Sequence, residues 1–408
     1  MKILFLTQFF PPESGAASKR IHGLAKHLVS LGHEVSVVTG MPNYPTGKIK
    51  EEYQNKTFCF EEIDGIKVFR YYVYVTNKKS TLNRLLNYFS LVVSSLFFLF
   101  KKKKVDVVIT SSPPLFLGIS GVIMSKLKKV PHVFDVRDIW PNVAVEIGEI
   151  TKHSKTYKLM SLVEKFIYKN SSMLTVVTKG KKETLIRNGV EKKKITLISN
   201  GFDEEFLTFP IDQHIAEKYE LSNKFNLLYA GIIGIAQGID LIIEAAESLK
   251  SYSHIQFVLV GTGVELEKIK KLVKEKGLSN VVFAGEQPHI NIRSFLHYSH
   301  ISLVPLKSNA LKDSVPTKLY EALGVGKPVI LSASGDSEEV VKEAQGGLVV
   351  KPGDVNELVK AIKKLYEDEI FYNRCIEMSE KYIIDNYSRK SIAKILENEL
   401  KLLLKIDK

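Results

Sequence analysis

Short apolar runs alternate with amphipathic stretches along most of the chain. The runs are rich in Val and Ile and nearly continuous, which is typical of strands buried on both faces of a parallel sheet. In the first half they cover residues 2–7, 35–39, 105–110, 132–136, 174–178 and 195–198, and in the second half residues 226–230, 256–260, 281–284, 301–305, 329–331 and 347–350. We expect a strand in each of these segments.

Amphipathic helical patterns separate the apolar runs, most clearly at residues 17–31, 239–250, 264–276 and 355–366. Strands that alternate with helices indicate an α/β fold with parallel sheets, and 408 residues exceed what one hydrophobic core usually organises. Both halves also begin with a strand, a glycine-containing loop and a helix. The pattern predicts two doubly wound α/β domains.

The domain boundary is predicted near a turn signal. Asn200-Gly201 favours a turn, and residues 202–212 follow neither the helical nor the strand period. We place an N-terminal domain at 1–205 and a C-terminal domain at 206–383. Residues 384–408 are predicted to form a C-terminal helix that packs back on the N-terminal domain or elsewhere.

One uncharged segment, residues 85–100, is apolar enough that it could span or contact a membrane. As a helix it would be about 24 Å long, shorter than the roughly 30 Å hydrocarbon core of a bilayer, and Asn and Ser residues interrupt it. Lysines occupy 78–79 before it and 101–104 after it. An apolar stretch between basic clusters is typical of contact with an anionic membrane surface, and a buried helix with a solvated lysine turn is the alternative.

The charge of the chain indicates which partners it binds, and its cysteine content limits the disulfides and metal sites it can form. Lys and Arg outnumber Asp and Glu by 58 to 45, so anionic partners are expected, but no RNA- or DNA-binding motif accompanies the charge. The two cysteines, Cys59 and Cys375, lie far apart, which excludes a disulfide framework and a cysteine metal site. No strand ends in an Asp-x-Asp motif, so we expect neither a metal nor another cofactor. A cytoplasmic protein fits these features.

Residues 313–328 form the sharpest candidate site. Pro316 suits the first turn of a helix, and Ser314 or Thr317 is expected to cap it. The helix follows the predicted strand at 301–305, so its N-terminus should lie at the carboxyl edge of a sheet, where open α/β folds bind ligands.

Charged side chains near this N-terminus suggest what it binds. The free amides of a helix N-terminus attract anions, and Lys318 adds a formal positive charge. Glu321 shares a helix face with Lys318, and Asp313 precedes the helix. Carboxylates beside a phosphate site are useful if they accept hydrogen bonds from sugar or ribose hydroxyls. An ordinary capped helix with a Lys–Glu pair is the simpler interpretation.

The spacing Asp313-x7-Glu321 followed by ALGVGKPV resembles the Glu-x7-Glu region of the retaining glycosyltransferases of family 4, which have the GT-B fold. Residues 11–39 resemble the N-terminal glycine loop and helix of that family, 197–203 its interdomain motif, and 259–270 its nucleotide-side glycine loop. These motifs occur together in the right order through nearly the whole chain. The resemblance implies two Rossmann-like domains facing across a cleft.

More narrowly, DVRDIWP (135–141), GIIGIAQGID and PTKLYEAL are similar to the bacterial surface-polysaccharide branch, including proteins assigned as L-fucosamine transferases of O-antigen and capsule synthesis. This implies a nucleotide sugar donor, UDP-linked and carrying an N-acetylated amino sugar. It implies a lipid-linked or growing glycan as acceptor, and a place at the inner face of the plasma membrane.

The resemblance also assigns roles to residues. Glu321 would hold the ribose hydroxyls, Asp313 would contact the donor sugar, and Lys318 with the amides of Thr317 and Lys318 would bind the diphosphate. The loops expected to approach the donor contain Gly15, Ala16, Gly231, Gly234, Gly261 and Gly263.

The chain departs from the family pattern at three positions. The first acid is Asp313, one methylene shorter than Glu. Ile232 and Gln237 occupy positions where Arg and Lys are common. Arg137 is the first candidate to supply the missing cation, ahead of Arg293 and Lys19, although it could instead pair with Asp135 or Asp138.

The chemistry near the anomeric carbon is assigned to Arg137 or Asp138, in the place where the family often has a histidine. No pair of carboxylates is arranged as nucleophile and acid, which favours front-face transfer without a covalent intermediate. Two other functions remain open: a sugar-nucleotide epimerase or a phosphorylase of the same architecture, and a non-catalytic protein that binds anionic membranes. No pyridoxal-phosphate motif supports a phosphorylase.

Overall fold

The computed structural model describes residues 1–13, 15–44, 46–76, 81–146, 148–306 and 312–406. They form two compact units. Unit 1 contains Met1–Ser199 and Ile392–Lys408, and unit 2 contains Asn200–Ser391. The chain thus leaves unit 1 earlier than the predicted boundary at 205 and re-enters it later than 384.

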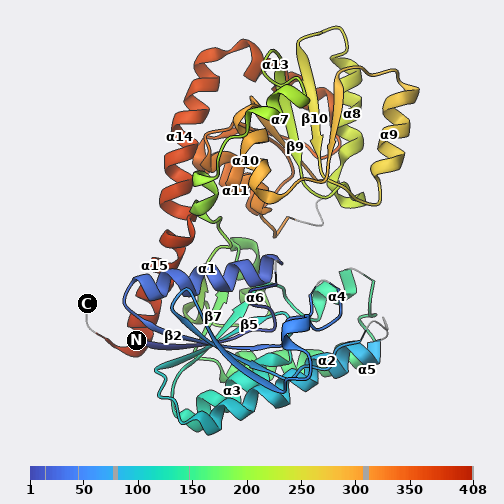
Figure 1. The fold of residues 1–408 in the computed structure, drawn as a ribbon. Coiled ribbons are helices and arrows are strands. Elements are labelled where there is room, and N and C mark those ends of the chain that lie inside the picture. The colour runs from blue at the N-terminus through green and yellow to red at the C-terminus, as the bar shows by residue number, and fades with distance from the viewer. Residues whose placement is uncertain (14, 45, 77–80, 147, 307–311, 407–408) are drawn as a thin grey trace. The chain divides into compact units, whose positions relative to one another are not determined.

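Unit 1 is built on an eight-stranded sheet with the order β3-β4-β2-β1-β5-β6-β7-β8 (Figure 1). Its strands are β1 (Lys2–Leu6), β2 (Glu34–Gly40), β3 (Phe58–Ile63), β4 (Ile66–Tyr71), β5 (Val107–Ser112), β6 (His132–Val136), β7 (Met173–Val176) and β8 (Ile195–Leu197). All neighbouring strands are parallel except β3 and β4, which form an antiparallel hairpin.

Helices cover both faces of this sheet. Alternate residues of a strand point to opposite faces. On one face, Ile3 and Phe5 of β1 pack with α1 (Ala16–Ser30) and the later part of α15 (Arg389–Leu404). On the other, Leu4 and Leu6 pack with α2 (Thr81–Ser95), the 3-10 helix η2 (Leu96–Lys101) and α3 (Leu117–Lys128). Beside α3 on that second face lies α5 (Lys155–Asn170), whose Ile167 packs on β6.

Unit 2 contains a fully parallel sheet with the order β11-β10-β9-β12-β13-β14. The strands are β9 (Phe225–Ala230), β10 (Ile255–Val260), β11 (Val281–Gly285), β12 (Ile301–Pro305), β13 (Val329–Ser332) and β14 (Gly347–Val350). One face packs against α8 (Ile239–Ser248), α9 (Leu266–Glu275) and α13 (Val355–Glu367). The other packs against α10 (His289–His297), α11 (Thr317–Gly324), α12 (Asp336–Ala344) and α14 (Glu369–Tyr387).

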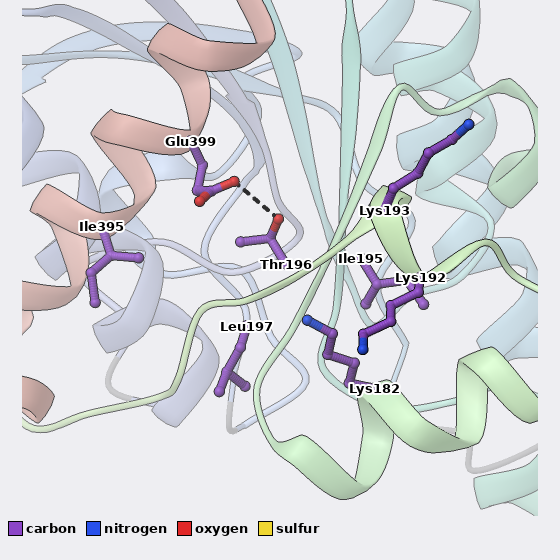
Figure 2. A pocket seen from close by; sticks show the side chains of 8 residues that line it. All are labelled: Lys182, Lys192, Lys193, Ile195, Thr196, Leu197, Ile395 and Glu399. Atoms are coloured by element: carbon purple, nitrogen blue, oxygen red, sulfur yellow. Dashed lines mark hydrogen bonds between the residues drawn. The ribbon is translucent and has the colours of Figure 1, made fainter.

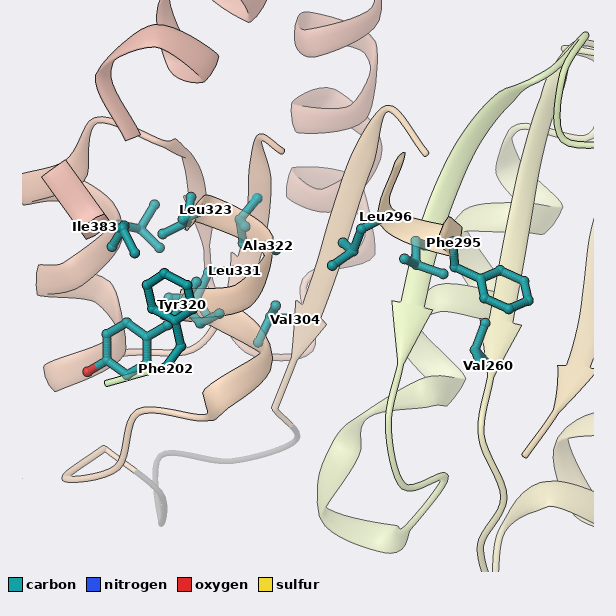
Figure 3. Close-up of a cluster of buried hydrophobic side chains, with 14 of the residues drawn as sticks. Phe202, Val260, Phe295, Leu296, Val304, Tyr320, Ala322, Leu323, Leu331 and Ile383 are labelled. Carbon is teal, nitrogen blue, oxygen red and sulfur yellow. The ribbon is translucent and has the colours of Figure 1, made fainter. Parts of the chain in front are cut away.

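The core on the α11 side of unit 2 is continuous from α10 to α14. Figure 3 shows side chains from α10, α11, β12 and α14 in this core, with Leu323 of α11 near Ile383 of α14. Helix α11, which carries the candidate site, is thus held by a buried face. The smaller elements are α4 (Asn142–Glu146), α6 (Lys179–Arg187), α7 (Gln213–Lys218), and the 3-10 turns η1 (Glu51–Tyr53), η3 (Lys192–Lys194), η4 (Glu204–Thr208) and η5 (Ile235–Gln237).

The predicted strands are all present, but one hairpin was missed and two expectations about helices were wrong. The hairpin β3–β4 was missed, although Asp64-Gly65 forms its turn with positive φ at both residues. The expected single helix from 384 is two helices, because the chain is extended at Ser388 between α14 and α15. The segment 85–100 is α2 followed by η2 rather than one α-helix. None of the described helices is long and apolar enough to cross a membrane.

Candidate functional site

The N-terminus of α11 lies beyond the end of β12 at the carboxyl edge of the unit 2 sheet. Pro316 is the N-cap residue, with extended backbone angles, and no side chain caps the helix. The expectation that Ser314 or Thr317 caps it was therefore wrong. Pro316 precedes the first turn instead of lying within it. An uncapped helix N-terminus keeps its first amides, at Thr317 and Lys318, available to an anion.

Lys318 projects from this first turn toward the end of β9. Its Nζ lies 4.1 Å from the centroid of the Tyr229 ring and donates a hydrogen bond of 3.3 Å to Oε1 of Gln237. Burial lowers the pKa of Lys318 to about 8, against the opposing attraction of Glu321. The amine is thus a poorly solvated cation with one neutral hydrogen-bond acceptor, and an anion placed beside it would be strongly attracted.

Glycines bring the neighbouring loops close enough to surround Lys318. Gly231 has φ of +150°, and a Cβ there would lie 2.8 Å from Lys318 Nζ. A Cβ at Gly261 would lie 1.9 Å from the Gly231 carbonyl oxygen, and one at Gly263 would lie 2.2 Å from the Ile233 carbonyl oxygen. Gly261 and Gly263 thus hold the loop at 231–234 by close backbone approach, whereas Gly231 lies directly against the lysine.

Glu321 lies one turn further along α11 and is paired. Its Oε1 is 2.9 Å from Nε2 of His289, at the start of α10. The His289 ring packs against Phe206 and Phe209, with ring centroids 5.2 and 5.8 Å away. Sequence reasoning missed His289, because only the fold brings α10 beside α11.

Asp313 lies in the segment that leads into α11. Helix α12 anchors this segment on both sides of it: the Asp336 amide donates to the Lys312 carbonyl at 2.8 Å, and Ser337 Oγ donates to the Ser314 carbonyl at 2.7 Å. The structure thus gathers Lys318, Glu321 and Asp313 around the beginning of α11, with the glycine loop of unit 2.

In unit 1, Gly15 is the N-cap of α1 and Ala16 its first residue, again with no side-chain cap. The loop before them is fixed by the buried carboxylate of Glu13, which accepts hydrogen bonds from the amides of Phe10, Asn43 and Tyr44 at 3.2, 2.9 and 2.9 Å. Burial raises the pKa of Glu13 despite these three donors. Glu13 is a second residue that the sequence did not single out.

Asp135 does not pair with Arg137. The Arg20 guanidinium donates to it at 3.1 Å, and Ser111 and Thr175 donate at 3.2 and 2.8 Å. Burial opposes ionisation of Asp135, but Arg20 and these donors together keep its pKa below the usual value. Asp135 is therefore a buried structural carboxylate joining β5, β6 and β7 to α1.

Arg137 and Asp138 follow β6, at the carboxyl edge of the unit 1 sheet. Arg137 Nε is buried and has no hydrogen-bond partner among the described residues. Burial and the nearby Arg20 lower the pKa of Arg137, while Asp135 and Asp138 oppose this effect. Arg293, another candidate cation, is instead attracted by Glu380 and repels Lys327, which lies beyond the C-terminal end of α11.

A separate pocket of about 700 Å³ lies along the edge strand β8 of unit 1 (Figure 2). Three lysines line it, and Thr196 donates a hydrogen bond to Glu399 of α15 at 3.3 Å. None of the candidate site residues lines this pocket. In the part of the chain that the structure describes, no three His, Cys, Asp or Glu side chains cluster in a way that could hold a metal ion.

Comparison with known families decides the class of protein. Residues 15–201 match the glycosyl transferase 4-like domain, and residues 211–382 match the family called glycosyl transferases group 1. The chain is a family 4 glycosyltransferase with the GT-B fold. The two matches correspond closely to the two units, so each unit of this glycosyltransferase is a recognisable domain of the family.

Similar proteins cover nearly the whole glycosyltransferase. WcaI of Escherichia coli K12, named as a glycosyl transferase of colanic acid biosynthesis, is 28% identical over 380 residues, covering 89% of this chain and 92% of WcaI. WbjE of Pseudomonas aeruginosa, named as a glycosyltransferase, is 23% identical over 72% of this chain and 74% of its own. The crystal structure of Anabaena HepE with UDP has a TM-score of 0.73 at 17% identity, covering 98% of this chain and 100% of HepE.

Proposed function

We propose that this glycosyltransferase moves a sugar from a nucleoside diphosphate sugar to a lipid-linked or growing polysaccharide. The reaction is a step in the synthesis of a bacterial surface glycan. The donor is UDP-linked and carries an N-acetylated amino sugar, and the product belongs to an O-antigen, a capsule or a related polysaccharide. The name of WcaI supports the polysaccharide, and the UDP bound to HepE supports the base of the donor. The enzyme acts in the cytoplasm, peripherally at the inner face of the plasma membrane.

The observation that carries the proposal is the position of Lys318 at an uncapped helix N-terminus. Two amides without a side-chain cap and one desolvated amine belong to the first turn of α11, and donors of this kind suit a diphosphate. As the bond between the anomeric carbon of the sugar and the diphosphate breaks, negative charge develops on the diphosphate. Fixed positive groups stabilise this charge without having to reorganise. We assign this role to Lys318 and the α11 amides, without a metal ion.

The remaining roles follow from the same placement. Glu321 accepts hydrogen bonds from the ribose hydroxyls, with His289 fixing the orientation of its carboxylate. Asp313 contacts the donor sugar. Arg137 and Asp138, together with the loop at Gly15 and Ala16, act on the side of the acceptor and the leaving group. Transfer proceeds on the front face with retention of configuration and without a glycosyl-enzyme intermediate.

A panel of UDP-, GDP- and ADP-sugars tests the proposal, with release of the nucleoside diphosphate as the readout and a parallel arm in EDTA. We expect UDP release from a UDP-linked amino sugar, unaffected by EDTA and dependent on a glycan acceptor. Interconversion of the sugar nucleotide without release of UDP would identify an epimerase instead. A glycosyl-enzyme adduct detected by mass spectrometry would overturn the front-face mechanism.

A further inference from the structure

The outward side of α2 and η2 is apolar. Leu86, Phe89, Val93 and Phe97 are 41–61% exposed and recur every three or four residues, so they form one row along the helix. Phe100 continues the row and is 78% exposed. Monomeric soluble proteins rarely leave such a continuous row in water, so this surface calls for a partner.

The polar residues of the same segment point inward. Asn87 donates to the Tyr74 carbonyl at 2.7 Å, Ser90 Oγ accepts from the Tyr74 amide at 2.7 Å, and Ser94 donates to the Tyr72 carbonyl at 2.6 Å. These groups satisfy the backbone that follows β4. The polar residues that weaken the segment as a membrane element thus form hydrogen bonds inside unit 1. Between residues 86 and 100, where the structure describes every side chain, each exposed side chain is apolar.

A second apolar row lies on the same face of the sheet. Leu159, Leu162 and Phe166 of α5 are exposed at helical spacing, and Leu127 of α3 is also exposed. Lys126 of α3 lies 5.9 Å from the centroid of the Phe166 ring, which ties the two helices at this surface. Figure 1 shows α2, α3 and α5 on one side of the unit 1 sheet. We call the outward side of α2, η2, α3 and α5 the apolar-basic face.

Charge on the apolar-basic face has one sign. Its exposed lysines are 101–104, 126, 129, 155, 158, 165 and 169. The sequences of α2, η2 and α3 contain no acidic residue, and Glu164 is the single one in α5. Burial raises the pKa of Glu164 to about 7, so its negative charge is reduced near neutral pH. Anionic lipid headgroups complement such a surface.

We propose that the apolar-basic face docks unit 1 on an anionic lipid bilayer, with Phe97 and Phe100 inserted at the boundary of headgroups and acyl chains and the lysines on the headgroup phosphates. A second copy of the chain fits poorly, because a two-fold interface would place these lysines against each other. The inference deepens the proposed function and rests on its lipid-linked acceptor. It adds α3 and α5 to a contact that the sequence suggests for residues 85–104 alone.

Flotation with phosphatidylcholine vesicles, with and without phosphatidylglycerol, tests the docking. The full-length protein should float only with vesicles that contain phosphatidylglycerol. Replacing Lys101–Lys104 by Gln should weaken this binding by on the order of a thousandfold, and Phe97→Ser with Phe100→Ser should weaken it about as much. The matched control replaces four exposed lysines of α9, Lys268, Lys270, Lys271 and Lys274, by Gln and removes the same charge. The control should float as the wild type does.

Binding that ignores phosphatidylglycerol, or that survives both sets of substitutions, would overturn the docking. So would a concentration-dependent dimer in analytical ultracentrifugation that Phe97→Ser with Phe100→Ser abolishes while flotation is unchanged. Release of UDP from the donor, with a glycan acceptor supplied, is measured in vesicle-free solution on the same protein preparations. Retained release with lost flotation rejects the docking alone, whereas flotation without release from any nucleotide sugar rejects the proposed catalysis alone.

Discussion

Gly231→Ala tests whether the position of Lys318 controls turnover. The added Cβ would lie 2.8 Å from Lys318 Nζ, so the amine must move by roughly half an ångström to restore an ordinary contact. A misplacement of about 1 Å in a catalytic group costs about a hundredfold, so we expect turnover to fall about tenfold. Alanine at φ of +150° also costs about 1–3 kcal/mol of folding stability, which thermal denaturation will register.

Gly234→Ala on the same loop is the control. Its Cβ would meet only Ile232 Cγ2 at 3.5 Å, an ordinary contact, and its φ of −120° accepts any residue. We measure initial rates of UDP release at saturating donor for both variants, alone and combined with Lys318→Ala. If Gly231→Ala acts through the lysine, it should lower turnover little further once Lys318 is Ala. Full activity of Gly231→Ala, or an equal loss in Gly234→Ala, would refute the reasoning.

Four further predictions concern charged groups. Lys318→Ala should lower turnover about a hundredfold, the cost of losing one electrostatic stabiliser. Glu321→Ala should lower kcat/KM for the donor by about ten- to a hundredfold, the cost of losing hydrogen bonds from the ribose to a charged group. Unchanged UDP release in either variant would contradict the site. Because the pKa of Lys318 is lowered to about 8, UDP affinity measured by calorimetry should decline as the pH rises through 8, and Lys318→Gln should remove this step. Between pH 8 and about 10.5 the unfolded chain binds more protons at this lysine, so the ligand-free enzyme should gain stability with pH there, in contrast to the Gln variant. Asp135→Asn leaves Arg20 buried without its anion and should cost about 3–5 kcal/mol in urea unfolding, followed through the single tryptophan, Trp140; a cost under 1 kcal/mol would show that the pair is dispensable.

The strands were predictable because burial on both faces leaves a nearly continuous apolar run. The exception is the hairpin β3–β4, where β3 pairs on one side only and alternates partly buried with exposed residues. Charged residues interrupt the apolar pattern of the hairpin: Glu61 and Glu62 in β3, and Lys67 and Arg70 in β4. The turn signal at Asp64-Gly65 was overlooked.

The residues of the candidate site also divide into those that local spacing predicts and those that only the fold brings together. Lys318 and Glu321 were predictable, because helical spacing alone puts them on one face of α11. His289 was not, because it lies on a different helix from Glu321, 32 residues away in the sequence. The partner of Asp135 was also hidden: Arg20 lies 115 residues away and reaches it only when α1 packs on the sheet. Contacts set by tertiary packing carry no local pattern.

Both ends of the chain complete the core of unit 1. Ile392, Ala393, Leu396 and Leu400 lie in the same buried cluster as Ile3 and Phe5. Domains usually fold from the N-terminus while the ribosome is still at work. Here unit 1 cannot complete its core until α15 has left the ribosome, after the whole of unit 2 has been made. During translation, one face of the unit 1 sheet therefore stays partly exposed until α15 packs on it. A message truncated within α15 would destabilise unit 1, the part of the protein that is translated first.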